Sequence, residues 1–278
     1  MLSYMVFRAN GARMLLVVAL AAVSLPWAAF CQAPQSPAQA ATRQPVLVEL
    51  FTSEGCSDCP PADALLGELD TRQFVPGAQA IVLSEHVTYW NHEGWRDPFS
   101  LDQMTDRQQA YMRQFLLSDV YTPQIVVDGA EQLVGNDPVK LAQAVTHAAT
   151  APKLSLTIDG AHQAADGSLV FAVHATGAKA TLVAAIAENA TSSEVAKGEN
   201  AGRTLHHVAV VRVLKEFGTG RTDGRQLELS GANLIAAEKS GIPLRFVVFL
   251  VNPKNGHIIG AAEQMLNPSP GAVEQTAR

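Results

Sequence analysis

Hydrophobic and polar positions along residues 45–150 predict strands and helices in regular succession. Short apolar runs bounded by turn residues are typical of buried strands, whereas apolar residues repeating every three or four positions indicate amphipathic helices. The predicted order is strand, helix, strand, helix, strand, strand, helix. These elements are expected at residues 46–51, 61–69, 80–87, 100–117, 124–127, 131–134 and 137–149.

Beyond Ala151-Pro152 the pattern changes to short runs of alternating residues separated by turn pairs such as Asn255-Gly256. Such runs predict about seven strands in an antiparallel sandwich. The expected strands cover residues 154–158, 169–175, 181–188, 206–215, 226–229, 244–251 and 257–264. The expected fold class is therefore an α/β domain over residues 45–150, followed by an all-β, sandwich-like domain over 152–267 and a disordered tail over 268–278.

The first forty residues have the composition of a signal peptide. Arg8 and Arg13 precede the apolar run 14–23, and Ala38-Gln39-Ala40 offers small residues for cleavage. The run is short for a membrane span, so we expect no span in the mature chain, although an uncleaved N-terminal anchor is an alternative. We therefore expect a periplasmic or secreted protein.

Composition and net charge limit the classes of partner that the protein can bind. The chain has 278 residues, 47% of them hydrophobic, which is enough to bury a sizeable core. Its 20 basic and 26 acidic residues give a net charge of −6, and residues 1–40 hold two of the basic residues and no acid, so the mature chain would carry −8. An acidic surface argues against nucleic acid as a partner.

Thiol chemistry is the leading interpretation of Cys56-Ser57-Asp58-Cys59, which lies between the first strand and the first helix. The backbone N–H groups at the start of a helix stabilise a thiolate. A structural bridge is the second interpretation, although closing so short a loop gives only about 2 kcal/mol. A metal site with His86 is the third, but zinc needs about four ligands and the sequence has no second Cys pair. Cys31 is expected to be lost with the signal peptide.

The arrangement of strand, Cys-x-x-Cys pair and helix, followed later by Thr122-Pro123 and a strand, resembles the thioredoxin superfamily over residues 45–150. Several separated motifs are also similar to a family of secreted bacterial proteins known as a domain of unknown function. Thr88 departs from that family's pattern, which has an acid there, and Gly55 departs from the Trp that precedes the first Cys in redox-active thioredoxins. The similar motifs are residues 49–56, 59–63, 86–87, 89–90, 121–124 and 198–205.

The thioredoxin resemblance implies roles for both thiols. Cys56 is the exposed sulfur that attacks a substrate disulfide, and Cys59 is the buried sulfur that resolves the mixed disulfide. Asp58, with Glu54 close by, would oppose formation of the Cys56 thiolate, or Asp58 would cap the helix. Glu49 is an acid within an apolar strand, where it would either handle the proton of Cys59 or pair with an Arg or a backbone donor.

The resemblance also implies a substrate-binding region. A cis Thr122-Pro123 bond would orient the Thr122 backbone for pairing with an extended peptide. Trp90 and Trp95, in the loop after the second strand, would form a groove beside the thiols or pack that loop against the core. His86 would tune Cys56 or be a buried structural residue.

The expected function is an exported thiol-disulfide oxidoreductase acting on protein or small-molecule disulfides through Cys56 and Cys59. No cofactor is expected, and the partners would be protein thiols or disulfides and an electron-donor protein. One alternative is an envelope binding or assembly protein with a structural Cys56–Cys59 bridge. Another is a metal- or copper-handling protein. His206 and His207 are expected to point to opposite faces of a strand, which makes them a poor metal pair.

Overall fold

A computed structural model describes residues 43–266 of the chain, except 165, 178, 221–223, 231–233, 235–236 and 238–239. The predicted signal peptide and C-terminal tail lie outside the described residues. No helix in the described part of the chain is long and apolar enough to cross a membrane.

The helices and strands lie close to their predicted positions. The first part of the chain forms β1 (Gln44–Thr52), α1 (Pro60–Arg72), β2 (Ala78–His86), α2 (Asp102–Gln114), β3 (Gln124–Val127), β4 (Glu131–Val134) and α3 (Pro138–Thr150). The second part forms β5 (Leu156–Gln163), β6 (Leu169–Ala175), β7 (Ala180–Glu194), β8 (Thr204–Gly220), β9 (Arg225–Leu229), β10 (Leu244–Val251) and β11 (Ile258–Leu266). The predicted order of elements is confirmed, and β7 and β8 are much longer than expected.

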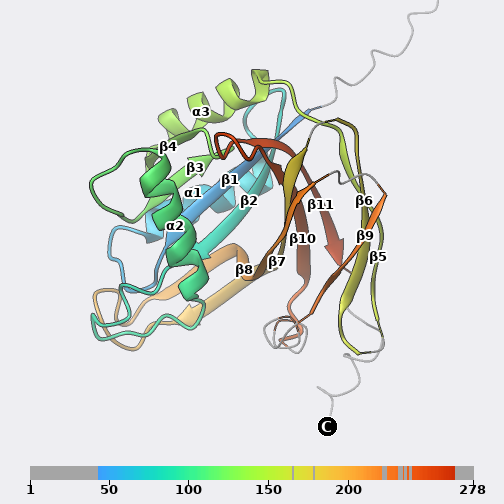
Figure 1. The fold of residues 1–278 in the computed structure, drawn as a ribbon. Helices are drawn as coiled ribbons and strands as arrows, with labels where there is room; N and C mark the ends of the chain where they lie inside the picture. Colours follow the sequence, from blue (N-terminus) through green and yellow to red (C-terminus); the bar gives the residue numbers. More distant parts are fainter. Residues whose placement is uncertain are drawn as a thin grey trace, which may run out of the picture. The chain divides into compact units, whose positions relative to one another are not determined.

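The predicted fold class is wrong, because one mixed sheet of eight strands contains strands from both parts of the chain. Its order is β11-β10-β7-β8-β2-β1-β3-β4 (Figure 1). β2 pairs in parallel with β1 on one side and with β8 on the other, where Ser84 is opposite Val210. The edge of β2 that a separate α/β domain would leave free is thus occupied by β8, so the structure is mostly β rather than an α/β domain followed by a sandwich.

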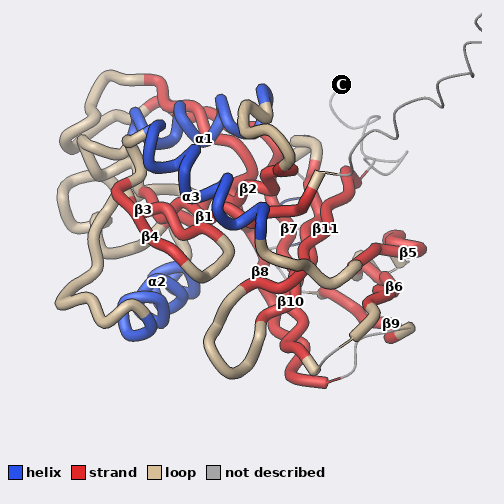
Figure 2. Tube along the Cα trace, turned by 90° about the horizontal axis from the view of Figure 1, so that it is seen from above, coloured by secondary structure: helices blue, strands red, loops and turns tan. Residues whose placement is uncertain are grey.

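Helices and a second sheet cover the two faces of the large sheet. Figure 2 shows α1 and α3 on one side of β1 and β3, and α2 on the other. The second sheet has the order β5-β6-β9 and packs against β7 and β10. Alternate residues of β7 point into two different hydrophobic cores. On one face, Leu182, Ala184 and Ile186 pack with the small sheet. On the other face, Val183 and Ala185 belong to the core shared with the helices.

The start of α1 follows from its sequence. Pro60 and Pro61 occupy the first helical positions, where a missing N–H costs nothing and the fixed φ favours the helix. Ala62, Leu66 and Leu69 recur at helical spacing and are buried. Because α1 begins directly after Cys59, the packing of this face fixes the position of the Cys pair.

Arg245 links α1 to the second part of the chain. Its guanidinium donates two hydrogen bonds to the Asp70 carboxylate at the end of α1, at 2.7 and 2.9 Å, and another to Asn189 Oδ1 at 2.7 Å. The side chains of Arg245 and Asp70 are 8% and 15% exposed. This bidentate geometry in a mostly buried setting makes the pair a strong connection between α1, β7 and β10.

We predict that Arg245→Ala lowers the free energy of unfolding by about 3 kcal/mol, because it leaves the Asp70 carboxylate buried without its partner. Urea denaturation measures the change. Arg72→Ala is the matched control: Arg72 forms a 3.6 Å ion pair with Glu68 on the exposed face of α1, and its loss should cost less than about 0.5 kcal/mol. Equal effects of the two substitutions would contradict the assignment.

Candidate functional site

Cys56 and Cys59 form a disulfide in the loop that joins β1 to α1, with their Cα atoms 5.4 Å apart. Both residues are buried, Cys56 at 1% and Cys59 at 0% exposure. Ser57 and Asp58 between them are exposed. The expectation that Cys56 is exposed is therefore wrong, because other segments cover the loop.

Trp90 is one part of this cover. The side chain that Gly55 lacks would lie 3.0 Å from the Trp90 Cβ and 3.2 Å from its carbonyl oxygen. A glycine at this position lets Trp90 lie this close to the backbone without displacement. Trp90, in the loop after β2, therefore lies directly against the backbone next to Cys56.

The tip of the β7–β8 hairpin, residues 195–203, also covers the Cys loop. The buried Asn200 side chain donates hydrogen bonds from Nδ2 to the carbonyl oxygens of Glu54 and Cys56, both at 2.9 Å. The Ser57 N–H donates to Glu199 Oε2 at 3.1 Å. The Cys loop is therefore held by residues more than 140 positions further along the chain.

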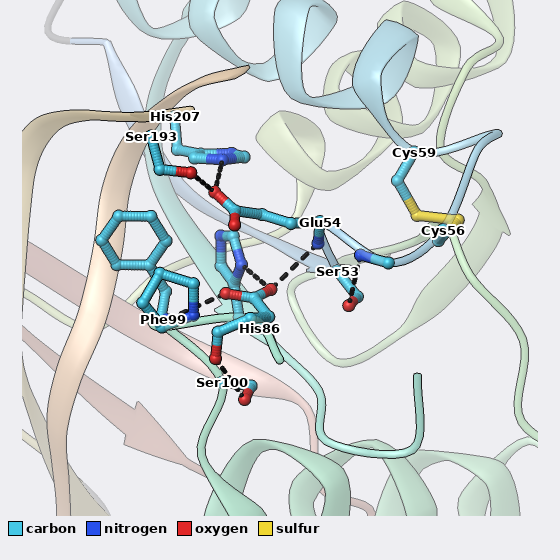
Figure 3. Close-up of polar contacts among 12 residues, drawn as sticks. Ser53, Glu54, Cys56, Cys59, His86, Phe99, Ser100, Ser193 and His207 are labelled. Carbon is cyan, nitrogen blue, oxygen red and sulfur yellow. Dashed lines mark hydrogen bonds and ion pairs between the residues drawn. A yellow bond between two sulfur atoms is a disulfide. The ribbon is translucent and has the colours of Figure 1, made fainter. Parts of the chain in front are cut away.

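A buried charged cluster lies beside this loop (Figure 3). The Glu54 carboxylate faces His207 Nε2 at 3.2 Å and accepts hydrogen bonds from the Trp95 indole at 2.8 Å and from the Ser193 hydroxyl. The other side of the His207 ring faces Asp63 of α1, with Nδ1 at 3.7 Å from Oδ2. His207 comes from β8, so this cluster exists only because β8 lies next to β2.

The environment of His207 favours its charged form. Burial favours the neutral ring, but the interactions with Asp63 and Glu54 outweigh burial and raise the pKa of His207 to about 10. Burial likewise opposes ionisation of Glu54, yet hydrogen bonds from His207, Ser193 and Trp95 hold its pKa below the ordinary value. At neutral pH the pair is an imidazolium and a carboxylate.

Asp97 and His86 extend the cluster. Asp97 Oδ2 lies 2.7 Å from His86 Nδ1 and accepts the Glu54 backbone N–H at 2.9 Å. Burial raises the pKa of Asp97, but His86 and the backbone donors of Glu54 and Phe99 outweigh burial and hold it at about 2. The His86 ring meets His207 edge-on, with centroids 4.6 Å apart, and its Nε2 has no hydrogen-bond partner among the described residues.

The structure brings the predicted substrate-binding residues towards the Cys loop. The Trp90 indole donates to Thr122 Oγ1 at 2.8 Å, and the predicted cis Thr122-Pro123 bond is confirmed. A side chain at Gly135 would meet both Pro123 and Ala62 of α1 at 3.1 Å, which places Pro123 close to the first turn of that helix. Trp95 binds Glu54 instead of lining an open groove.

Glu49 is paired with Arg107, in agreement with the prediction that this acid pairs with an Arg or a backbone donor. Its carboxylate accepts hydrogen bonds from Arg107 Nε and from the Tyr111 hydroxyl of α2, both at 2.6 Å. Glu85 on the neighbouring strand lies 3.5 Å from the same guanidinium. Burial, together with the nearby charge of Glu49, raises the pKa of Glu85 well above its ordinary value. Glu49, Glu85, Arg107 and Tyr111 form a second buried cluster.

The other predicted residues have mixed outcomes. Asp58 does not cap α1: Cys59 occupies the cap position, and no side chain caps this helix. His206 is exposed and His207 buried, which confirms that they point to opposite faces. Among the described residues, no group of three or more His, Cys, Asp and Glu side chains is arranged to hold a metal ion.

Sequence reasoning missed the roles of Asp63, Asp97, Asn200 and His207. The segment 198–205 does share a motif with the family considered above, and this is the sequence signal that the hairpin tip belongs to the site. Nothing local to the Cys pair indicates which strand supplies a histidine.

Together, the fold and site of the described residues define a mostly β protein in which three helices and a small sheet cover a large mixed sheet, with a buried disulfide where β1 meets α1. A family model described as a protein of unknown function, DUF1223, matches residues 47–250. The chain belongs to this family. That confirms the expected membership of a family of unknown function, whereas export and redox activity remain predictions.

A crystal structure of a protein from Agrobacterium tumefaciens is similar in fold. The two have a TM-score of 0.61 and 25% sequence identity, and the match covers 81% of this chain and 95% of that one. No curated protein matches the sequence.

We predict that the stabilising effect of His207 disappears at high pH. A histidine whose pKa is raised in the folded state contributes stability fully below its unfolded pKa of about 6.5, and this contribution is lost as pH rises through the folded value. The difference in unfolding free energy between the wild type and His207→Asn should therefore shrink from about pH 6.5 to about pH 10. The exposed neighbour His206→Asn provides the control and should show no such trend.

Proposed function

We propose that the protein is a thiol-disulfide oxidoreductase that uses Cys56 and Cys59. The observation that carries the proposal is the disulfide at the first turn of α1. There the backbone N–H groups favour a thiolate, and the imidazolium of His207 is paired with Glu54, two residues before Cys56. Pro123 lies near this turn, which agrees with the substrate-binding role proposed for Thr122 and Pro123.

The reduced protein would transfer two electrons. The Cys56 thiolate attacks one sulfur of a substrate disulfide, forms a mixed disulfide and releases the other substrate sulfur as a thiolate. The Cys59 thiolate then attacks Cys56, re-forms the Cys56–Cys59 bond and releases the second substrate thiolate. The substrate gains two electrons and takes up two protons, and an electron-donor dithiol returns the protein to its reduced form. Export to the periplasm or beyond is part of the proposal, since disulfide substrates persist in oxidising compartments.

Substrate access to Cys56 depends on Trp90 and the hairpin tip, residues 195–203, which cover the Cys loop. Ser57 and Asp58 are the exposed residues of the loop, and Trp90 and Thr122 at its side are half-buried. An extended peptide would bind along Thr122 and Pro123 when the Trp90 side chain and the hairpin tip move away from Cys56. Small thiols would need a smaller movement.

A structural bridge is the second candidate, and the burial of both sulfurs favours it. In that case the protein would be an envelope binding or assembly protein, and the disulfide would only fix the start of α1. The two candidates differ in one measurable property, which is whether the bond is broken and re-formed in the folded protein.

We predict that the Cys56–Cys59 bond equilibrates reversibly with glutathione while the protein stays folded. The fraction of reduced protein is measured by alkylation and mass spectrometry over a series of glutathione ratios, with circular dichroism reporting the fold. Related redox-active pairs have potentials between about −270 and −120 mV. A bond that stays oxidised throughout the series, or breaks only on unfolding, would support the structural bridge.

We also predict that Cys59→Ser captures substrate proteins as mixed disulfides through Cys56, because the resolving thiol is absent. Diagonal gels of an envelope extract, run first without and then with reductant, would reveal the captured proteins. Cys56→Ser is the matched control and should capture far fewer, since the proposed mechanism assigns the attack on the substrate disulfide to Cys56 and not to Cys59.

A further inference from the structure

One side chain connects the two ends of the Cys loop. Glu54 lies two residues before Cys56, and Asp63 lies four residues after Cys59. His207 stands between them, 3.2 Å from Glu54 and 3.7 Å from Asp63. The side chains of His207 and Glu54 are 0% exposed and that of Asp63 is 5% exposed. This bridge is separate from the disulfide and spans the same loop.

The hairpin that supplies His207 holds the loop at further points. Ser193 binds the same Glu54 carboxylate, and Asn200 binds the carbonyl oxygens of Glu54 and Cys56. Arg203 in turn donates to Asn200 Oδ1 at 2.8 Å and orients its amide. All of these contacts can persist when the sulfur–sulfur bond is absent.

We propose that His207 is a positioning residue that keeps the Cys56–Cys59 loop in one conformation whether the disulfide is formed or broken. This inference rests on the proposed function, because it concerns the dithiol form of the same pair. With the loop held at Glu54 and Asp63, the two thiols stay adjacent after reduction. Re-forming the bond then requires little ordering of the chain, so the pair is easily oxidised by a substrate disulfide.

The groups around His207 fit this role. Glu54 and Asp63 face its two nitrogens, while His86 and Phe99 pack edge-on against its ring, with centroids 4.6 and 5.6 Å away. Asp97 Oδ2 lies 2.7 Å from His86 Nδ1 in the same cluster. The raised pKa of His207 means that the bridge stays charged throughout the pH range in which thiols and disulfides exchange.

The test is the equilibrium between the protein and dithiothreitol. One dithiothreitol molecule gives two electrons and two protons to the protein disulfide, becomes a cyclic disulfide and leaves Cys56 and Cys59 as thiols. Losing the bridge lowers the effective concentration of one thiol near the other, so the equilibrium moves towards the dithiol. For His207→Asn we expect a shift of about tenfold, equivalent to about 30 mV.

Controls separate this effect from a general loss of structure. His206→Asn, on the exposed side of the same strand, should leave the equilibrium constant within about twofold of the wild type. Asp63→Asn, which keeps the shape and removes one carboxylate from His207, should shift it in the same direction by less, and it serves if His207→Asn does not fold. An unchanged equilibrium constant in a folded His207→Asn variant would overturn the proposal.

A second measurement tests the role of His207 even if dithiothreitol cannot reduce the wild-type protein. That failure to be reduced would refute the proposed oxidoreductase function but not the role of His207. A disulfide stabilises the folded state according to how close that state holds the two sulfurs, relative to the unfolded chain. The gap in melting temperature between the oxidised protein and its Cys56→Ala/Cys59→Ala variant should therefore be smaller with His207→Asn than with His207 present. Equal gaps in the two backgrounds would refute the role of His207.

Discussion

The parallel pairing of β8 with β2 is the constraint on which the site depends. Ser84 lies opposite Val210 at this junction. The N-terminal end of β8 lies beside α1, where His207 faces Asp63. His207 thereby reaches Glu54 and Asp63, and the hairpin tip reaches the Cys loop. Without this pairing the acids around the loop would be buried with no cation, which is costly in a protein interior.

In the described residues, two buried clusters at β1 and β2 each place acids around one basic side chain, with different results. On the α2 side, Glu49 and Glu85 share Arg107, and burial together with the charge of Glu49 raises the pKa of Glu85. At the end of β1, His207 stands between Glu54 and Asp63, and the pKa of Glu54 is lowered. The first cluster is therefore suited to holding a proton, whereas the second keeps opposite charges in place.

Local signals in the sequence predict most of the elements but not their arrangement. The strands at 124–127, 131–134, 169–175 and 244–251 lie where hydrophobic alternation predicts them. The β2–β8 pairing has no such signal, because it joins segments more than 100 residues apart and depends on which edge of the sheet is free. The length of β7 and β8 is equally hard to predict, because both strands continue through an irregularity. β8 contains Ala209 at φ 48°, and its register with β7 shifts between Ile186 and Ala187. The Cys pair could be found from its spacing, whereas its burial could not, since Asn200 and Trp90 come from distant segments.

The continuous sheet also limits how this protein can be divided or recombined. A fragment ending after α3 would keep the Cys-x-x-Cys sequence but expose the backbone of β2 as an open edge, which is prone to pair with other chains. It would also lack the imidazole, the amide and the hydroxyl that hold the loop. Transplanting the first 150 residues onto another scaffold would thus transfer a sequence motif without its chemistry, and a fusion or truncation of this protein has to preserve the hairpin of β7 and β8 to preserve the site.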